Sequence, residues 1–134
     1  MKRNSRLYLA LHTLSHMAVE PDRMRTSADI AEHAGTNPVV VRRVLGQLRK
    51  ADLLKSEKGH AGGWRLARPA EKISLADVYI ALDERMVGTD EVDDDPSCSV
   101  ERALQKKVTG VLEEIEATLI HRLGKTTILE ICGK

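Results

Sequence analysis

Apolar residues recur at intervals of three and four through the first fifty positions, a spacing that predicts amphipathic helices. One helix is predicted over residues 5–19 and a short second helix over residues 26–34. Asn37 followed by Pro38 is typical of an N-cap and first helical position, so a third helix is predicted over residues 38–50. The side of this third helix that should face inward is aliphatic and consists of Val41, Val44, Leu45 and Leu48.

The period of the pattern changes after the third helix. Two short strands are predicted over residues 53–57 and 64–67, joined by the glycine-rich segment 58–63. Ser74 with Asp77 is a capping box that opens another helix. The sequence therefore predicts, in order, three helices, a two-stranded wing and a fourth helix.

The second half of the chain begins with an acidic segment, residues 83–95, which is poor in apolar residues and is predicted to be a linker. The longest helix follows and ends at Gly124, and Thr127 caps a short final helix. We therefore predict a mainly α fold: a winged helix-turn-helix domain over residues 1–82, the linker, and residues 96–134 with a long dimerisation helix and the short final helix.

The composition supports packed helices, because the chain is 42% hydrophobic but only 2% aromatic and has no Phe. No stretch approaches the ~18 unbroken apolar residues of a membrane helix. The two cysteines form no disulfide framework, which agrees with a reducing compartment. We therefore expect a cytoplasmic protein without a membrane partner.

Charge is divided unevenly along the chain. Residues 1–68 carry thirteen Lys and Arg against six Asp and Glu, whereas residues 69–134 carry eight against fourteen. Cations occur on the first helix, on the outward side of the third helix and on the wing, as the clamping of a phosphate backbone requires. The basic half is therefore predicted to bind a polyanion.

Several segments make the chain resemble the Rrf2 family of bacterial winged helix-turn-helix regulators, to which IscR, NsrR and CymR belong. The segments are TSADIA from Thr26, NPVVVRRVL from Asn37, LRKADLL from Leu48, KGHAGGWRLAR from Lys58 and ISLADVY from Ile73. One departure is Asp52, which stands where the family usually has Gly. The resemblance implies a sequence-specific transcriptional regulator, expected to be a repressor, that binds a near-palindromic operator in duplex DNA as a homodimer.

The resemblance places the third helix in the major groove and the wing in the minor groove, which assigns the DNA contacts. Base or groove contacts are assigned to Asn37, Val39, Val40, Arg42, Arg43 and His60. Phosphate contacts are assigned to Lys2, Arg6, Thr26, Ser27, Lys58 and Arg65. The alternative is a winged-helix module that binds proteins without specific DNA binding. No catalytic motif occurs, so no enzyme activity is expected.

The apolar stripe of the long helix independently predicts a homodimer, because it is too long for so small a domain to cover. The predicted interface residues are Leu104, Val108, Val111, Leu112, Ile115 and Leu119. The alternative for this stripe is burial within one chain.

Many members of the family hold an iron–sulfur cluster through three cysteines before the long helix. Here only Cys98 occupies that region, so we expect no cluster and no other cofactor. Cys98 is a candidate redox sensor: its place at a helix start favours a thiolate, and Asp93, Asp94 and Asp95 oppose it. An inert cysteine is the alternative.

His12 and His16 have the spacing of two zinc ligands on one helix. A third ligand is not evident from the sequence, and a surface position explains both residues. No metal site is therefore expected.

Overall fold

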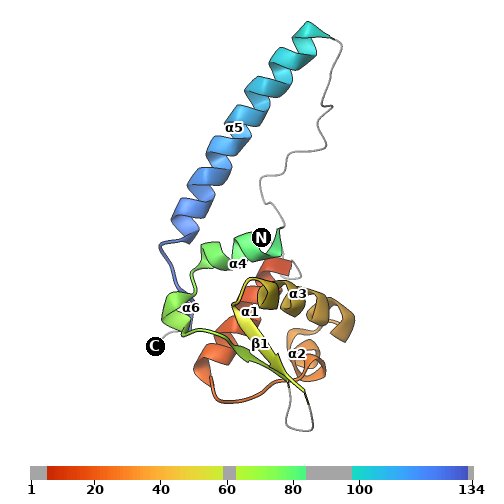
Figure 1. Cartoon of the computed structure of the whole chain (residues 1–134), viewed down its shortest axis with the longest axis vertical. Coiled ribbons are helices and arrows are strands. Elements are labelled where there is room, and N and C mark those ends of the chain that lie inside the picture. Colours follow the sequence, from red (N-terminus) through yellow and green to blue (C-terminus); the bar gives the residue numbers. More distant parts are fainter. Residues whose placement is uncertain (1–5, 59–62, 84–97, 133–134) are drawn as a thin grey trace.

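A computed structural model of the chain describes residues 6–58, 63–83 and 98–132. Figure 1 shows a compact body of short helices with a two-stranded wing, from which one long helix projects. The elements are α1 (Arg6–Val19), α2 (Ser27–Ala34), α3 (Pro38–Lys50), β1 (Leu54–Glu57), β2 (Gly63–Leu66), a 3-10 turn η1 (Ala70–Lys72), α4 (Leu75–Leu82), α5 (Ser99–Leu123) and α6 (Ile128–Ile131). The mainly α winged fold is as predicted.

The core lies between α1, α3 and α4 and is aliphatic apart from Tyr79. All four residues predicted to line the inward side of α3 are buried. The largest side chains that are almost fully buried are Leu14, Met17, Leu45, Leu48, Leu53, Leu54, Ile73, Leu82 and Ile128. Burial of each such side chain contributes on the order of 1.5–3 kcal/mol, so this cluster fixes how α3 sits on α1.

Local caps set the ends of the helices that form the helix-turn-helix unit. The Thr26 hydroxyl accepts a 3.0 Å hydrogen bond from the backbone N–H of Asp29 and begins α2. Gly35 ends α2 in the left-handed conformation, with φ 70°. Asn37 Oδ1 then accepts from the backbone N–H of Val40 at 3.0 Å and begins α3. The turn that sets the direction of α3 is thus determined by hydrogen bonds and backbone conformation within a few residues of sequence.

The wing is an antiparallel pair in which Leu54 lies opposite Leu66. A further backbone pairing, which the sequence did not reveal, joins β2 to the segment before α2. Trp64 N–H donates to the Arg25 carbonyl at 2.7 Å, and Arg25 N–H donates to the Trp64 carbonyl at 3.2 Å. This bridge fastens the wing to the start of α2.

Helix α6, which the sequence analysis grouped with the long helix, packs on the winged-helix body. Ile128 is fully buried in the core. Its N–H donates to the Ile73 carbonyl at 2.9 Å, and the N–H of Leu75 donates to the Thr126 carbonyl at the same distance. The chain therefore returns to its first domain after α5. Residues 84–95 of the predicted linker lie outside the described residues.

Helix α5 begins at Ser99, with Cys98 as its N-cap, and contains no buried residue. Its C-terminal end is held on the body, because Leu119, Ile120 and Leu123 pack against the core. The Tyr79 hydroxyl of α4 also donates to the Glu116 carboxylate at 3.0 Å. The rest of the helix projects from the body (Figure 1). Among the described helices, none has the length and apolar character needed to cross a membrane.

Candidate nucleic-acid interface

The outward side of α3 offers both apolar and cationic groups. Val39 and Val40 are exposed near its start, and Arg42 and Arg43 are exposed after the buried Val41. Within the described residues, neither guanidinium has an acidic partner. Arginines recognise guanine edges, and apolar groups contact thymine methyls, in the major groove. The side predicted to read bases is therefore open to a ligand.

Asn37, also predicted to contact DNA, has a structural task at the same time. Its side-chain oxygen caps α3, and the residue is exposed. The cap leaves the amide NH₂ as the group that can donate to an acceptor outside the chain. A contact by Asn37 is thus tied to the orientation of α3.

The start of α2 carries the two hydroxyls that were assigned to phosphate. Thr26 is exposed, and its oxygen caps the helix. The Ser27 oxygen accepts from the indole Nε1–H of Trp64 at 3.0 Å, which leaves the Ser27 hydroxyl hydrogen available. Because N–H groups at a helix start favour anions, the position suits a phosphate.

Trp64 is a positioning residue that the sequence analysis missed. Besides its bond to Ser27, its ring lies under the Arg49 guanidinium of α3, 5.9 Å from the ring centroid. Arg49 also donates to the Ser56 hydroxyl of β1 at 3.3 Å. One side of the wing therefore contacts both α2 and α3. The signal available in the sequence was a single Trp that directly follows two glycines and begins a predicted strand.

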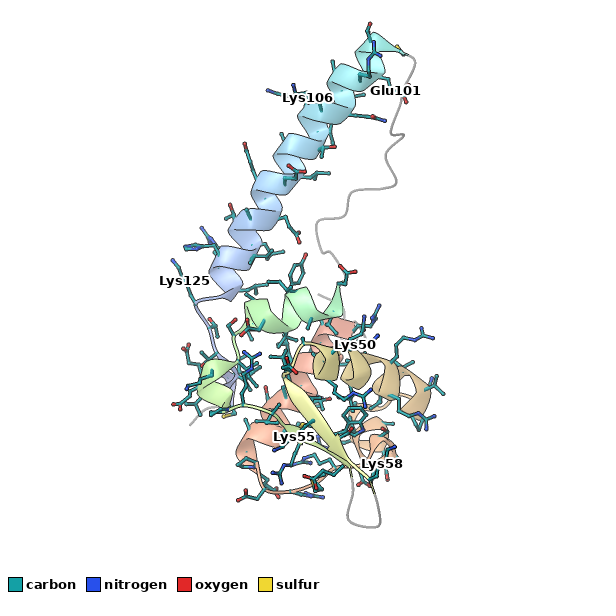
Figure 2. All side chains as sticks on the ribbon, viewed as in Figure 1. Lys50, Lys55, Lys58, Glu101, Lys106 and Lys125 are labelled. Carbon is teal, nitrogen blue, oxygen red and sulfur yellow. The ribbon has the colours of Figure 1, made fainter. Side chains whose placement is uncertain are left out.

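The cations predicted on the wing do not lie together. Lys58 is exposed at the end of β1, toward the hairpin tip (Figure 2). Arg65 follows Trp64, so it lies on the opposite side of the strand, where it pairs with Glu57 at 3.8 Å and lines a pocket with Ala18. The structure does not bring Arg65 to the side that faces α3, and its phosphate contact stays a prediction. His60 lies outside the described residues.

Arg6 and Arg68 have partners inside the protein. Arg6 is half-buried and donates to the Gln47 side chain on α3, whose amide in turn donates to the Leu82 carbonyl at 3.1 Å. The Arg68 guanidinium donates to the Ala51 carbonyl at 3.3 Å, after the end of α3. Both arginines help to hold α3 in place, and the phosphate contact of Arg6 stays a prediction. Lys2 lies outside the described residues.

The predicted dimer stripe is divided by the structure. Leu104, Val108, Val111 and Ile115 are 60%, 47%, 46% and 47% exposed. Leu112 is half-buried. Leu119 instead packs against the core of its own chain. At that end of α5, the stripe is therefore covered within one chain, which was the alternative to a dimer interface.

The cysteines do not fit an iron–sulfur cluster. Cys98 is exposed at the start of α5, and Cys132, which follows α6, is half-buried. The 25 residues of α5 separate Cys98 from the body that holds Cys132, and such a helix is about 37 Å long. These two thiols cannot reach one cluster within a chain, and a cluster needs several such ligands.

Comparisons with known proteins agree with this geometry. Residues 3–134 match the family described as Rrf2, an iron-dependent transcriptional regulator. The chain is 34% identical over 130 residues to YwnA of Bacillus subtilis (strain 168), named as an HTH-type transcriptional regulator, with 96% of this chain and 95% of that protein covered.

Solved structures are similar over nearly the whole chain. A crystal structure described as a DNA-binding protein is 30% identical, with a TM-score of 0.76 and coverage of 95% of this chain and 98% of the other. Oxidised CymR of Staphylococcus aureus is 22% identical, with a TM-score of 0.68 and coverage of 100% and 98%. The second likeness concerns the fold alone.

Proposed function

We propose, from the premise that this chain belongs to the Rrf2 family of winged-helix transcriptional regulators, that it acts as a homodimeric repressor on a near-palindromic operator. The chain is a DNA-binding regulator of transcription and not an enzyme. The observation that carries the proposed binding mode is the exposure of Arg42 and Arg43 on α3, the helix that Trp64 of the wing contacts; neither arginine has an acidic partner in the part of the chain that the structure describes. The alternative of a protein-interaction module does not account for these groups.

Support for the homodimer comes from α5. Five large apolar side chains, Val100 and the four exposed stripe residues, are exposed along a helix that projects from the body. A second copy is the partner whose matching stripe would cover them. A two-fold pair would present two α3 helices to successive major grooves, about 34 Å apart. A near-palindromic operator follows from that symmetry.

Repression is proposed because it requires no contact beyond the operator. A dimer seated on a promoter excludes polymerase by occupying the DNA, whereas activation requires a further surface for polymerase. We also propose that the protein works without an iron–sulfur cluster and in the cytoplasm, where bacterial DNA lies. Duplex DNA and a second copy of the chain are its proposed partners.

The test is selection of bound genomic fragments, followed by titration of the selected duplex and a scrambled duplex against salt. Binding through Lys and Arg should give a log–log slope near −0.9 per phosphate neutralised. Arg42→Ala and Arg43→Ala should each weaken the selected duplex by about 1–3 kcal/mol and reduce the preference over the scrambled duplex.

Two further variants separate the roles. Lys58→Ala should weaken both duplexes about equally, because a phosphate contact carries no sequence information. Arg102→Ala is the matched control, since Arg102 is exposed on α5, and it should leave both affinities unchanged. Weak binding to both duplexes without preference would support the protein-interaction module instead.

A further inference from the structure

Three histidines converge where α1 meets α2. His12 and His16 lie one turn apart on α1, and His33 lies in the last turn of α2. The Nε2 atoms of His16 and His12 are 3.0 Å apart, and those of His33 and His16 are 2.9 Å apart. Sequence spacing revealed only the first two residues. The third was missed because the fold brings it from 17 positions away.

Hydrogen bonding among the rings does not satisfy all three nitrogens. A neutral imidazole nitrogen is either a donor with an N–H or an acceptor with one lone pair. His16 Nε2 faces both neighbours, so it has to share one proton or one lone pair between His12 and His33. If each of the three rings instead directs one nitrogen lone pair at a single cation, all three nitrogens are satisfied and none has to share a proton or a lone pair.

The space at this cluster is the size of one ion or water molecule. The pocket has a volume of about 20 Å³, and a cavity needs roughly 10–15 Å³ to hold a water. It is lined by His12, Thr13, His16, Arg25, Asp29, Ile30, His33 and Ala34. A larger organic ligand does not fit it.

Burial and neighbouring charges act on two of the rings. Burial, followed by the charge of His33, lowers the pKa of His12, and burial, His33, His12 and Arg25 lower the pKa of His16. The pocket is also lined by Arg25, whose positive charge opposes a cation, and by Asp29, whose negative charge favours one.

We propose that His12, His16 and His33 form a site for one late first-row divalent metal ion, with Zn²⁺ as the probe of choice. Imidazole ligands suit this group of metals. Zn–N bonds of about 2.0–2.1 Å place tetrahedral nitrogens about 3.3 Å apart. The His12–His16 and His16–His33 pairs therefore need to separate by only a few tenths of an ångström, and the ligand atoms of all three residues lie within 4.8 Å of one another. Water would complete the coordination, and the ion would tie α2 to α1.

The experiment uses full-length protein without an affinity tag, in a Cys98→Ser/Cys132→Ser background that removes both thiols. Titration with Co²⁺ should give the absorption of a tetrahedral nitrogen site, saturating at one ion per chain, and Zn²⁺ should displace the cobalt. His33→Gln should weaken Zn²⁺ binding by more than about 100-fold. Loss of an outer-shell hydrogen-bond partner of a ligand costs about 10–100-fold in metal affinity, and loss of the ligand itself should cost more.

The matched controls are His60→Gln and His121→Gln, the two other histidines of the chain, and both should bind Zn²⁺ as the parent does. Thermal unfolding provides a second measurement. Zn²⁺ should raise the melting temperature of the parent and both controls, and not that of folded His33→Gln or His16→Gln. Absence of stoichiometric binding, or unchanged affinity in His33→Gln, would overturn the proposal.

Discussion

The indole Nε1–H of Trp64 donates a 3.0 Å hydrogen bond to the hydroxyl oxygen of Ser27. The bond joins β2 of the wing to the first residue of α2, across 37 positions of sequence. Together with the Arg25–Trp64 backbone bridge, it sets where the wing lies relative to the helix-turn-helix unit.

A double-mutant cycle measures that bond. Trp64→Phe and Ser27→Ala should each lower the free energy of unfolding by about 1 kcal/mol or more, with a coupling energy of about 0.5–1.5 kcal/mol between them. Urea unfolding of the parent, the two single variants and the double variant gives the four free energies that the cycle needs. Thr127→Ala, which removes a distant cap on α6, should be additive with Trp64→Phe. Additive Trp64 and Ser27 effects would show that the bond does not contribute to stability.

Gly63 is required by the close approach of the wing to Arg25. Its φ is +152°, and a Cβ there would lie 2.5 Å from the Arg25 carbonyl oxygen. Gly63→Ala should therefore lower the free energy of unfolding by at least about 2 kcal/mol and weaken DNA binding through the displaced wing. Gly46→Ala in α3 meets open space and should stabilise the protein by up to about 1 kcal/mol. Equal stabilities of the two variants would contradict this account.

Asp52 occupies a left-handed conformation, with φ 61°, at the position where the Rrf2 pattern has Gly. Gly adopts this conformation without a Cβ penalty, and Asp tolerates it better than Ala. In urea unfolding, the free energy of unfolding of Asp52→Gly should exceed that of the parent by about 0.5–1 kcal/mol, and that of Asp52→Ala should be lower than that of the parent. Asp83, with φ 51°, provides a second position where the same order is expected. A parent more stable than Asp52→Gly would reverse the argument.

Val108 lies in the exposed part of the α5 stripe. Val108→Asp should convert the proposed dimer to monomer at micromolar concentration, because two copies would each bury a charge opposite an apolar surface. Sedimentation or light scattering reports the mass. Val19→Asp, at an equally exposed apolar residue at the end of α1, should remain dimeric. A monomeric parent protein, or a dimeric Val108→Asp, would exclude this interface.

The two cysteines should differ in reactivity. Cys98 is exposed, whereas Cys132 is half-buried and its thiol donates to the Leu129 carbonyl at 3.2 Å. A thiol reagent should label Cys98 first, and Cys98→Ser should remove the fast phase that Cys132→Ser keeps. If Cys98 senses oxidants, mild peroxide should change operator binding of the parent but not of Cys98→Ser. Identical responses would identify an inert cysteine.

The sequence by itself determined the helices, their caps and the order of the elements. The caps at Thr26, Asn37 and Ser74 involve residues three positions away, so their physical causes are local and visible in spacing. The aliphatic side of α3 was predicted for the same reason, because a helix repeats every 3.6 residues.

Only the tertiary structure decided which distant side chains meet. It placed His33 beside His12 and His16, returned Ile128 to the core and directed Arg6 to Gln47. Each of these relationships depends on how elements pack after they form. Packing is set by the summed burial of many side chains from separate segments, and no single stretch of sequence contains that sum.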